Sequence, residues 1–170
     1  MGGRPAAACS APGQPCSQAA VAHELARTCD RRANAAHARA VLQRGGERRT
    51  LDGVYHVGLL NNWRDVVADQ LSTLVACGVL DVARSLTVSY QSGKQTSPGA
   101  AAELAALVRG TTAGVAAEVR LVPSAVSKPP WEAAAIDAVA AHCSSSETNP
   151  TLGLVFYLHS KGVTRHRPDW

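Results

Sequence analysis

Residues 54–78 read VYHVGLLNNWRDVVADQLSTLVACG, a short apolar run followed by a longer segment of helical periodicity. The run over residues 54–60 is rich in β-forming side chains and lacks proline, which predicts a buried strand. In the segment that follows, apolar residues recur every three or four positions from Trp63 to Val75, and Gly78 comes soon after. This spacing predicts an amphipathic helix. Asn62 and Asp65 resemble a capping box at its start.

The same alternation of strand and helix continues along the chain. Further strands are expected at residues 86–90, 118–122 and 152–158, further helices at residues 100–109 and 131–143, and a serine loop at 144–146. Such alternation is typical of a parallel sheet, and the continuous apolar strands indicate that both of its faces are covered. We therefore expect an α/β fold with an open, mostly parallel sheet of about four strands and helices on both faces.

Residues 1–50 form a segment of different composition. They contain eight arginines, three acidic residues and no aromatic residue, whereas residues 51–170 contain nine basic and ten acidic residues. Residues 1–16, rich in glycine and proline, are expected to be disordered, and residues 17–43 to form an alanine-rich helix. This basic leader is interpreted either as a plain extension or as an organellar targeting segment.

The composition also excludes several classes of protein. No apolar run approaches the roughly 18 residues of a membrane span. The first residues also lack the continuous apolar run of a secretory signal, so no such signal is expected. The net charge of +4 comes from the leader, which has no aromatic platform, so no nucleic-acid partner is expected. The five cysteines form no C-x2-C pair, so we expect no zinc site and interpret them as reduced, intracellular thiols.

Function is expected at the carboxyl ends of the strands, where open α/β sheets bind ligands. The residues that follow the last strand are His159, Ser160, Lys161 and Gly162. In an extended chain His159 and Lys161 share one face, and a histidine donor beside a cation suits an anion such as a diphosphate. The alternative is a solvated loop of ordinary basic residues.

The first strand ends in a second candidate. Asn61 and Asn62 precede the predicted helix, whose free N–H groups can hold a ribose, a base or a phosphate. The alternative is a plain helix cap, with Trp63 in the core. His56, within the apolar strand, is interpreted as a hydrogen-bonded core histidine, and the alternative for it is a ligand role. No strand is followed by a P-loop, a G-x-G-x-x-G turn or a G-x-S-x-G elbow, which argues against P-loop ATPases, dinucleotide dehydrogenases and α/β-hydrolases.

Three blocks of the sequence together resemble an uncharacterised group of glycosyltransferase-like proteins. The blocks are residues 55–57 with 62–71, residues 78–83 (GVLDVA) and residues 157–163 (YLHSKGV), and the resemblance covers residues 54–164. This group is similar to GT-A nucleotide-sugar transferases and to proteins of polysaccharide assembly. The resemblance implies a UDP- or GDP-sugar donor, a glycan acceptor and glycosyl transfer.

The sequence departs from the GT-A pattern at the last strand. There a GT-A transferase carries an Asp-x-Asp pair that holds a divalent metal on the donor diphosphate, whereas this chain has His159 and Lys161. This departure argues against a metal site, and Lys161 would neutralise the diphosphate directly. The strand ends and the resemblance together give the predicted substrate-binding residues as His159, Ser160, Lys161, Gly162, Asn61 and Asn62, with no catalytic base assigned.

The pattern of the group also continues beyond this last block. Residues 51–170 are therefore expected to be the nucleotide-binding part of a larger glycosyltransferase-like domain. The alternative is an inactive or fragmentary α/β binding module without enzymatic activity.

Overall fold

The computed structural model describes residues 29–43, 49–92, 96–124, 133–147 and 153–160. The elements in chain order are α2 (Arg31–Leu42), β1 (Thr50–Gly58), α3 (Trp63–Ala76), the short 3-10 helix η2 (Val79–Asp81), β2 (Ser85–Gln91), α4 (Ala100–Thr111), β3 (Glu118–Pro123), α5 (Ala133–Glu147) and β4 (Gly153–His159). All strand pairs are parallel, and the order across the sheet is β3-β2-β1-β4. The predicted open α/β fold with four parallel strands is confirmed.

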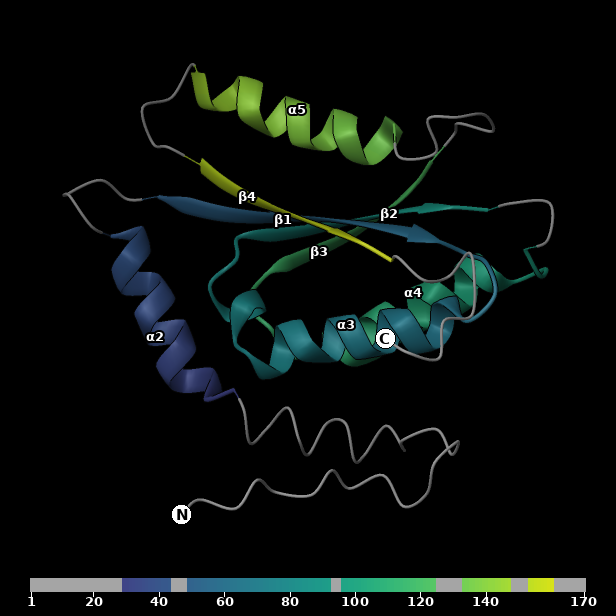
Figure 1. Cartoon of the computed structure of the whole chain (residues 1–170), viewed down its shortest axis with the longest axis horizontal. Helices are drawn as coiled ribbons and strands as arrows, with labels where there is room; N and C mark the ends of the chain where they lie inside the picture. The colour runs from purple at the N-terminus through teal and green to yellow at the C-terminus, as the bar shows by residue number, and fades with distance from the viewer. Residues whose placement is uncertain (1–28, 44–48, 93–95, 125–132, 148–152, 161–170) are drawn as a thin grey trace, which may run out of the picture.

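Helices cover both faces of this sheet (Figure 1). α5 lies over one face, α3 and α4 lie against the other, and α2 lies next to η2 on the α3 side. In the part of the chain that the structure describes, no helix combines the length and the apolar composition of a membrane span.

Alternation along the strands makes the two faces of the sheet chemically different. Tyr55 and Val57 of β1 are fully buried in the core with α3 and α4, where the buried side chains of the neighbouring elements are Leu86, Val88, Val67, Leu71, Leu104 and Val108. The intervening residues of β1 point towards α5. They include Asp52 and His56, both buried, and Ser89 of β2 lies beside His56. The core therefore lies on the α3–α4 side, and the face under α5 is polar.

Two predicted boundaries in the first part of the chain are wrong. β1 begins at Thr50, before the predicted start, because Thr50 and Leu51 already pair with β4 and the next two residues pair with both neighbouring strands. α2 begins only at Arg31, because Asp30 has extended backbone angles and its carboxylate accepts a hydrogen bond from the N–H of Ala33 at 2.9 Å. The continuous helix predicted over residues 17–43 is thus interrupted at Asp30, and its first part and the predicted disorder of residues 1–16 lie outside the described residues.

Two further local predictions are corrected. α5 continues to Glu147, so residues 144–146 are helical and form no loop. α3 begins after Asn62 as predicted, but the Asn62 side chain makes no capping hydrogen bond, so the capping box with Asp65 is wrong. The turn before α3 is held instead by backbone bonds, from Trp63 N–H to the carbonyl of Leu60 at 3.1 Å and from Asp65 N–H to that of Asn62 at 3.1 Å.

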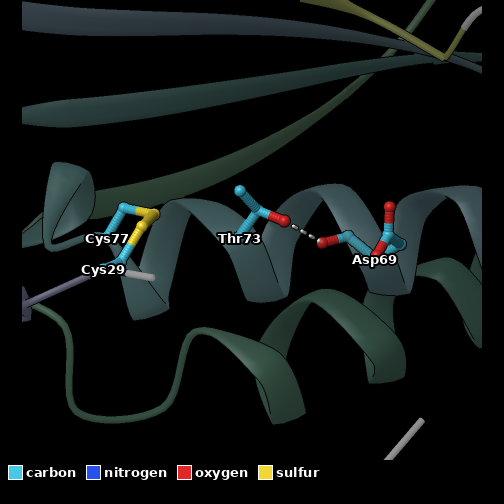
Figure 2. The surroundings of a disulfide bond; sticks show 4 residues. All are labelled: Cys29, Asp69, Thr73 and Cys77. Carbon is cyan, nitrogen blue, oxygen red and sulfur yellow. Dashed lines mark hydrogen bonds between the residues drawn. A yellow bond between two sulfur atoms is a disulfide. The ribbon is translucent and has the colours of Figure 1, made fainter. Parts of the chain in front are cut away.

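A disulfide joins α2 to the end of α3. Cys29, just before α2, is bonded to Cys77, the residue that follows α3, across a sequence separation of 48 residues (Figure 2). The prediction that all five cysteines are reduced thiols is therefore wrong for this pair, because the docking of α2 brings two distant cysteines together. The expectation of an intracellular location rested on that prediction, so the disulfide takes this support away. Cys143 is an exposed free thiol.

The same junction is closed by an ion pair and a glycine. Arg31 donates two hydrogen bonds to Asp81 of η2, from Nε to Oδ2 at 2.6 Å and from Nη2 to Oδ1 at 2.7 Å. Gly78 has φ of 72°, and a Cβ there would lie 2.5 Å from the carbonyl oxygen of Arg31. Glycine is thus required both by its left-handed backbone and by the close approach of α2.

Candidate functional site

The strand order places a reversal between β1 and β4. From β1 the chain adds β2 and β3 on one side of the sheet, and then adds β4 on the other side of β1. In open α/β sheets, ligands bind at the carboxyl edge where the order reverses in this way. Of the four strand ends that the sequence singles out, the structure therefore selects those of β1 and β4.

Four of the six predicted site residues lie at this edge. Asn61 and Asn62 follow β1, and His159 and Ser160 close β4, whose partner in the sheet is β1. Lys161 and Gly162 lie outside the described residues. The sequence thus identifies two distant segments, and the parallel pairing of β1 with β4 brings them together.

Ser160 joins the ends of the two strands. It is fully buried, its hydroxyl oxygen accepts a hydrogen bond from Gly58 N–H at 3.1 Å, and its own N–H donates to the carbonyl of His56 at 3.0 Å. Ser160 therefore links the carboxyl end of β4 to that of β1. The predicted contact of Ser160 with a substrate stays a prediction.

The two histidines of this edge are neighbours in the sheet. His56 pairs with His159 in the register, and their ring centroids are 5.4 Å apart with a tilt of 32°. His56 is only 3% exposed, and its Nδ1 lies 2.9 Å from the hydroxyl oxygen of Ser89. The interpretation of His56 as a hydrogen-bonded core histidine agrees with this geometry, while His159 is partly exposed at the end of β4.

The loop from β1 to α3 presents the two asparagines differently. Asn61 is exposed and has φ of 49°, a left-handed conformation that asparagine tolerates better than most residues. The carboxamide oxygen of Asn62 is buried and has no hydrogen-bond partner among the described residues. A buried acceptor without a donor is destabilising, so this oxygen is a natural contact for a bound donor group.

The first turn of α3 is otherwise committed to the fold. Trp63 is 2% exposed and belongs to the core, as the alternative interpretation of this cap expects. Arg64 lies over the Trp63 ring at 4.8 Å from the centroid, and its Nε donates to Glu103 of α4 at 2.7 Å. Trp63 is therefore not available to stack on a base, and Arg64 links the start of α3 to α4.

A second polar cluster, which was not predicted from the sequence, lies at the opposite end of β1. The Asp52 carboxylate accepts hydrogen bonds from Arg84 Nε at 3.1 Å, from Arg84 Nη2 at 2.6 Å and from the Ser85 hydroxyl at 2.5 Å, and His142 Nδ1 of α5 lies 3.4 Å from it. Burial raises the pKa of Asp52, but these hydrogen bonds and the charge of Arg84 outweigh it and hold the pKa below its ordinary value. The one signal in the sequence was an acid and an arginine at the starts of two strands.

Neither cluster is arranged as a metal centre. Over the residues that the structure describes, no group of three or more histidine, cysteine, aspartate and glutamate side chains is placed to hold a metal ion. The carboxyl edge offers amide and imidazole groups, backbone N–H groups and the start of a helix, which suit a polar or anionic organic ligand.

Comparison with known proteins adds no identity to this geometry. No protein-family model matches the chain, and neither a curated protein nor a solved structure gives a significant match. The function is therefore argued from the site itself and from the resemblance of its sequence blocks.

Proposed function

We propose that the carboxyl edge at β1 and β4 binds the nucleotide diphosphate of a UDP- or GDP-sugar, and that the chain is the donor-binding part of a glycosyltransferase-like protein. The observation that carries the proposal is the reversal of strand order between β1 and β4, with Asn61–Asn62 and His159–Ser160 on its two sides. The resemblance of residues 54–164 to glycosyltransferase-like proteins supports the choice of a nucleotide sugar.

Each residue has a role that its chemistry allows. The buried carboxamide oxygen of Asn62 accepts a hydrogen bond from a ribose hydroxyl or a base amino group. The N-terminus of α3 favours negative charge, which suits the diphosphate. Lys161, which follows Ser160 in the sequence, supplies the cation that the GT-A pattern obtains from a metal, and His159 supplies a further N–H donor.

A binding module without enzymatic activity is the second candidate. The observation in its favour is His159, which stands where a GT-A transferase carries an acidic residue and which lies against His56. Glycosyl transfer also needs a base for the acceptor hydroxyl, and we assign this role to no residue. Release of nucleoside diphosphate from a nucleotide sugar distinguishes the two candidates, since only the enzyme produces it.

The test is a thermal-shift panel of UDP- and GDP-sugars with the full chain. A ligand that binds only the folded protein raises the melting temperature as its concentration exceeds the Kd. Asn62→Ala and Lys161→Ala should reduce the shift. Ser124→Ala is the matched control, because its hydroxyl is also buried without a partner among the described residues but follows β3. The proposal fails if no nucleotide sugar raises the melting temperature at millimolar concentration.

A further inference from the structure

A pocket of about 260 Å³ lies between α5 and the sheet, at the end of β1 opposite the carboxyl edge. Its polar walls come from Asp52, Arg84, Ser85, Thr87, Arg120 and His142, and its apolar walls from Gly53, Val54, Val155, Ala138 and Ala141. Figure 1 shows α5 lying across this face of the sheet. We propose that the pocket is a second binding site, for a small organic ligand whose carboxylate or phosphate group is held by Arg84 and Arg120.

The acceptors of the pocket are already used. Both oxygens of the Asp52 carboxylate accept from Arg84, one of them also accepts from the Ser85 hydroxyl, and the other faces His142. The carboxylate is only 6% exposed, so it is enclosed by these partners. The buried acid therefore serves to orient Arg84 and leaves little capacity to bind a cation.

The donors of the pocket are in excess. Arg84 uses Nε and Nη2 for Asp52, and Arg120 uses Nε and Nη2 for Glu118 at 2.8 and 2.7 Å. Each guanidinium carries further N–H groups, and both arginines line the pocket with side chains that are 63% exposed for Arg84 and 61% exposed for Arg120. A paired carboxylate fixes each fork, and the remaining donors suit an oxyanion, which guanidinium groups bind with charge-assisted hydrogen bonds.

The small side chains of α5 leave room for the body of a ligand. Ala138 and Ala141 line the pocket, and His142 lines it beside them. The His142 ring lies close to Gly153 of β4, where a Cβ would be 2.7 Å from its Nε2. At about 30 Å³ for each water, the volume corresponds to about nine waters. The pocket thus suits a small carboxylic acid or phosphate ester.

The test uses inorganic phosphate as the probe, titrated into the full chain by calorimetry at constant ionic strength against chloride. Saturable binding is expected. Arg120→Gln should weaken it about tenfold, because one charge-assisted interaction is lost. This exposed arginine forms its ion pair with Glu118, which is also exposed, so the fold should be little affected. Arg109→Gln, an exposed arginine at the end of α4, is the matched control and should leave the Kd unchanged.

A second pair of variants tests the pocket by shape. Ala141→Leu fills the pocket and should abolish phosphate binding, whereas Ala140→Leu, on the neighbouring exposed position of α5, should not. Asn62→Ala should also leave phosphate binding unchanged, which separates this site from the proposed nucleotide site. The inference is overturned if phosphate shows no saturable binding, if Arg120→Gln and Arg109→Gln weaken it equally, if Ala141→Leu still binds, or if Asn62→Ala abolishes it.

Discussion

The backbone N–H of Gly58 donates a hydrogen bond to the hydroxyl of Ser160 at 3.1 Å, across 102 residues of the chain. Ser160 returns a second bond, from its N–H to the carbonyl of His56 at 3.0 Å. These two bonds fasten the carboxyl end of β4 to that of β1. The candidate nucleotide site is therefore held together by a residue that is itself buried.

Ser160→Ala should destabilise the protein by about 1–3 kcal/mol, because the N–H of Gly58 loses its acceptor in a partly buried setting. The measurement is the free energy of unfolding from urea denaturation. Ser124→Ala serves as the control and should be close to neutral, since its hydroxyl has no partner among the described residues. Equal, negligible effects in both variants would contradict the structural role of Ser160.

Gly53→Ala tests the packing of β4 and β2 on β1. A Cβ at Gly53 would lie 2.3 Å from Cζ of Phe156 and 2.8 Å from Cδ1 of Leu86, so the substitution should cost about 1–3 kcal/mol of stability. Gly110→Ala, within α4, meets no atom within 4 Å and should stabilise the helix by about 0.5–1 kcal/mol. Opposite signs of the change in melting temperature are expected, and a tolerated alanine at position 53 would be incompatible with this strand order.

Removing the disulfide should lower stability. The bond between Cys29 and Cys77 closes a loop with a sequence separation of 48 residues, and the double serine variant should unfold about 2–4 kcal/mol more easily. Cys143→Ser, at the exposed free thiol, should change stability by less than about 0.5 kcal/mol. Mass spectrometry of the alkylated protein provides a direct check, and alkylation of all cysteines without a reductant would contradict the pairing.

Acid should destabilise the protein in part through Asp52. Its pKa is lower in the folded protein than its ordinary value of 3.8, so the folded state favours the charged carboxylate. The resulting stability is present above that ordinary value and is lost as the pH falls through the lower pKa of the folded state. Asp52→Asn should therefore flatten the acid limb of stability against pH, whereas Asp137→Asn, exposed on α5, should not. An unchanged acid limb in Asp52→Asn would contradict the role of the network.

The fold could be predicted from the sequence because short segments rich in β-forming residues alternate along the chain with segments of helical character. Residues 54–78 alone contain the second half of β1 and all of α3. The start of β1 could not be predicted in this way, because Asp52 and Gly53 are poor strand formers that are held in β1 by pairing with β2. Tertiary contacts outweigh local preference at such positions.

The candidate site at the carboxyl edge could likewise be predicted only in part. Asn61, Asn62, His159 and Ser160 could be proposed, because residues that follow apolar strands lie at the carboxyl edge of a parallel sheet. Which of the four strand ends lie together depends on the order β3-β2-β1-β4, and no local pattern contains that order.

The Asp52–Arg84 ion pair and the disulfide of Cys29 are further contacts that local patterns do not contain. Each joins side chains from separate elements, so each depends on how those elements pack.

The proposed nucleotide site is tested most directly by amide NMR spectra of the full chain during titration with UDP- and GDP-sugars. The account predicts saturable shifts that cluster at residues 58–64 and at Ser160, with the same residues unresponsive in Asn62→Ala. Shifts confined to the surroundings of Arg84 and Arg120, or no shifts at millimolar ligand, would contradict a nucleotide-sugar site at the ends of β1 and β4.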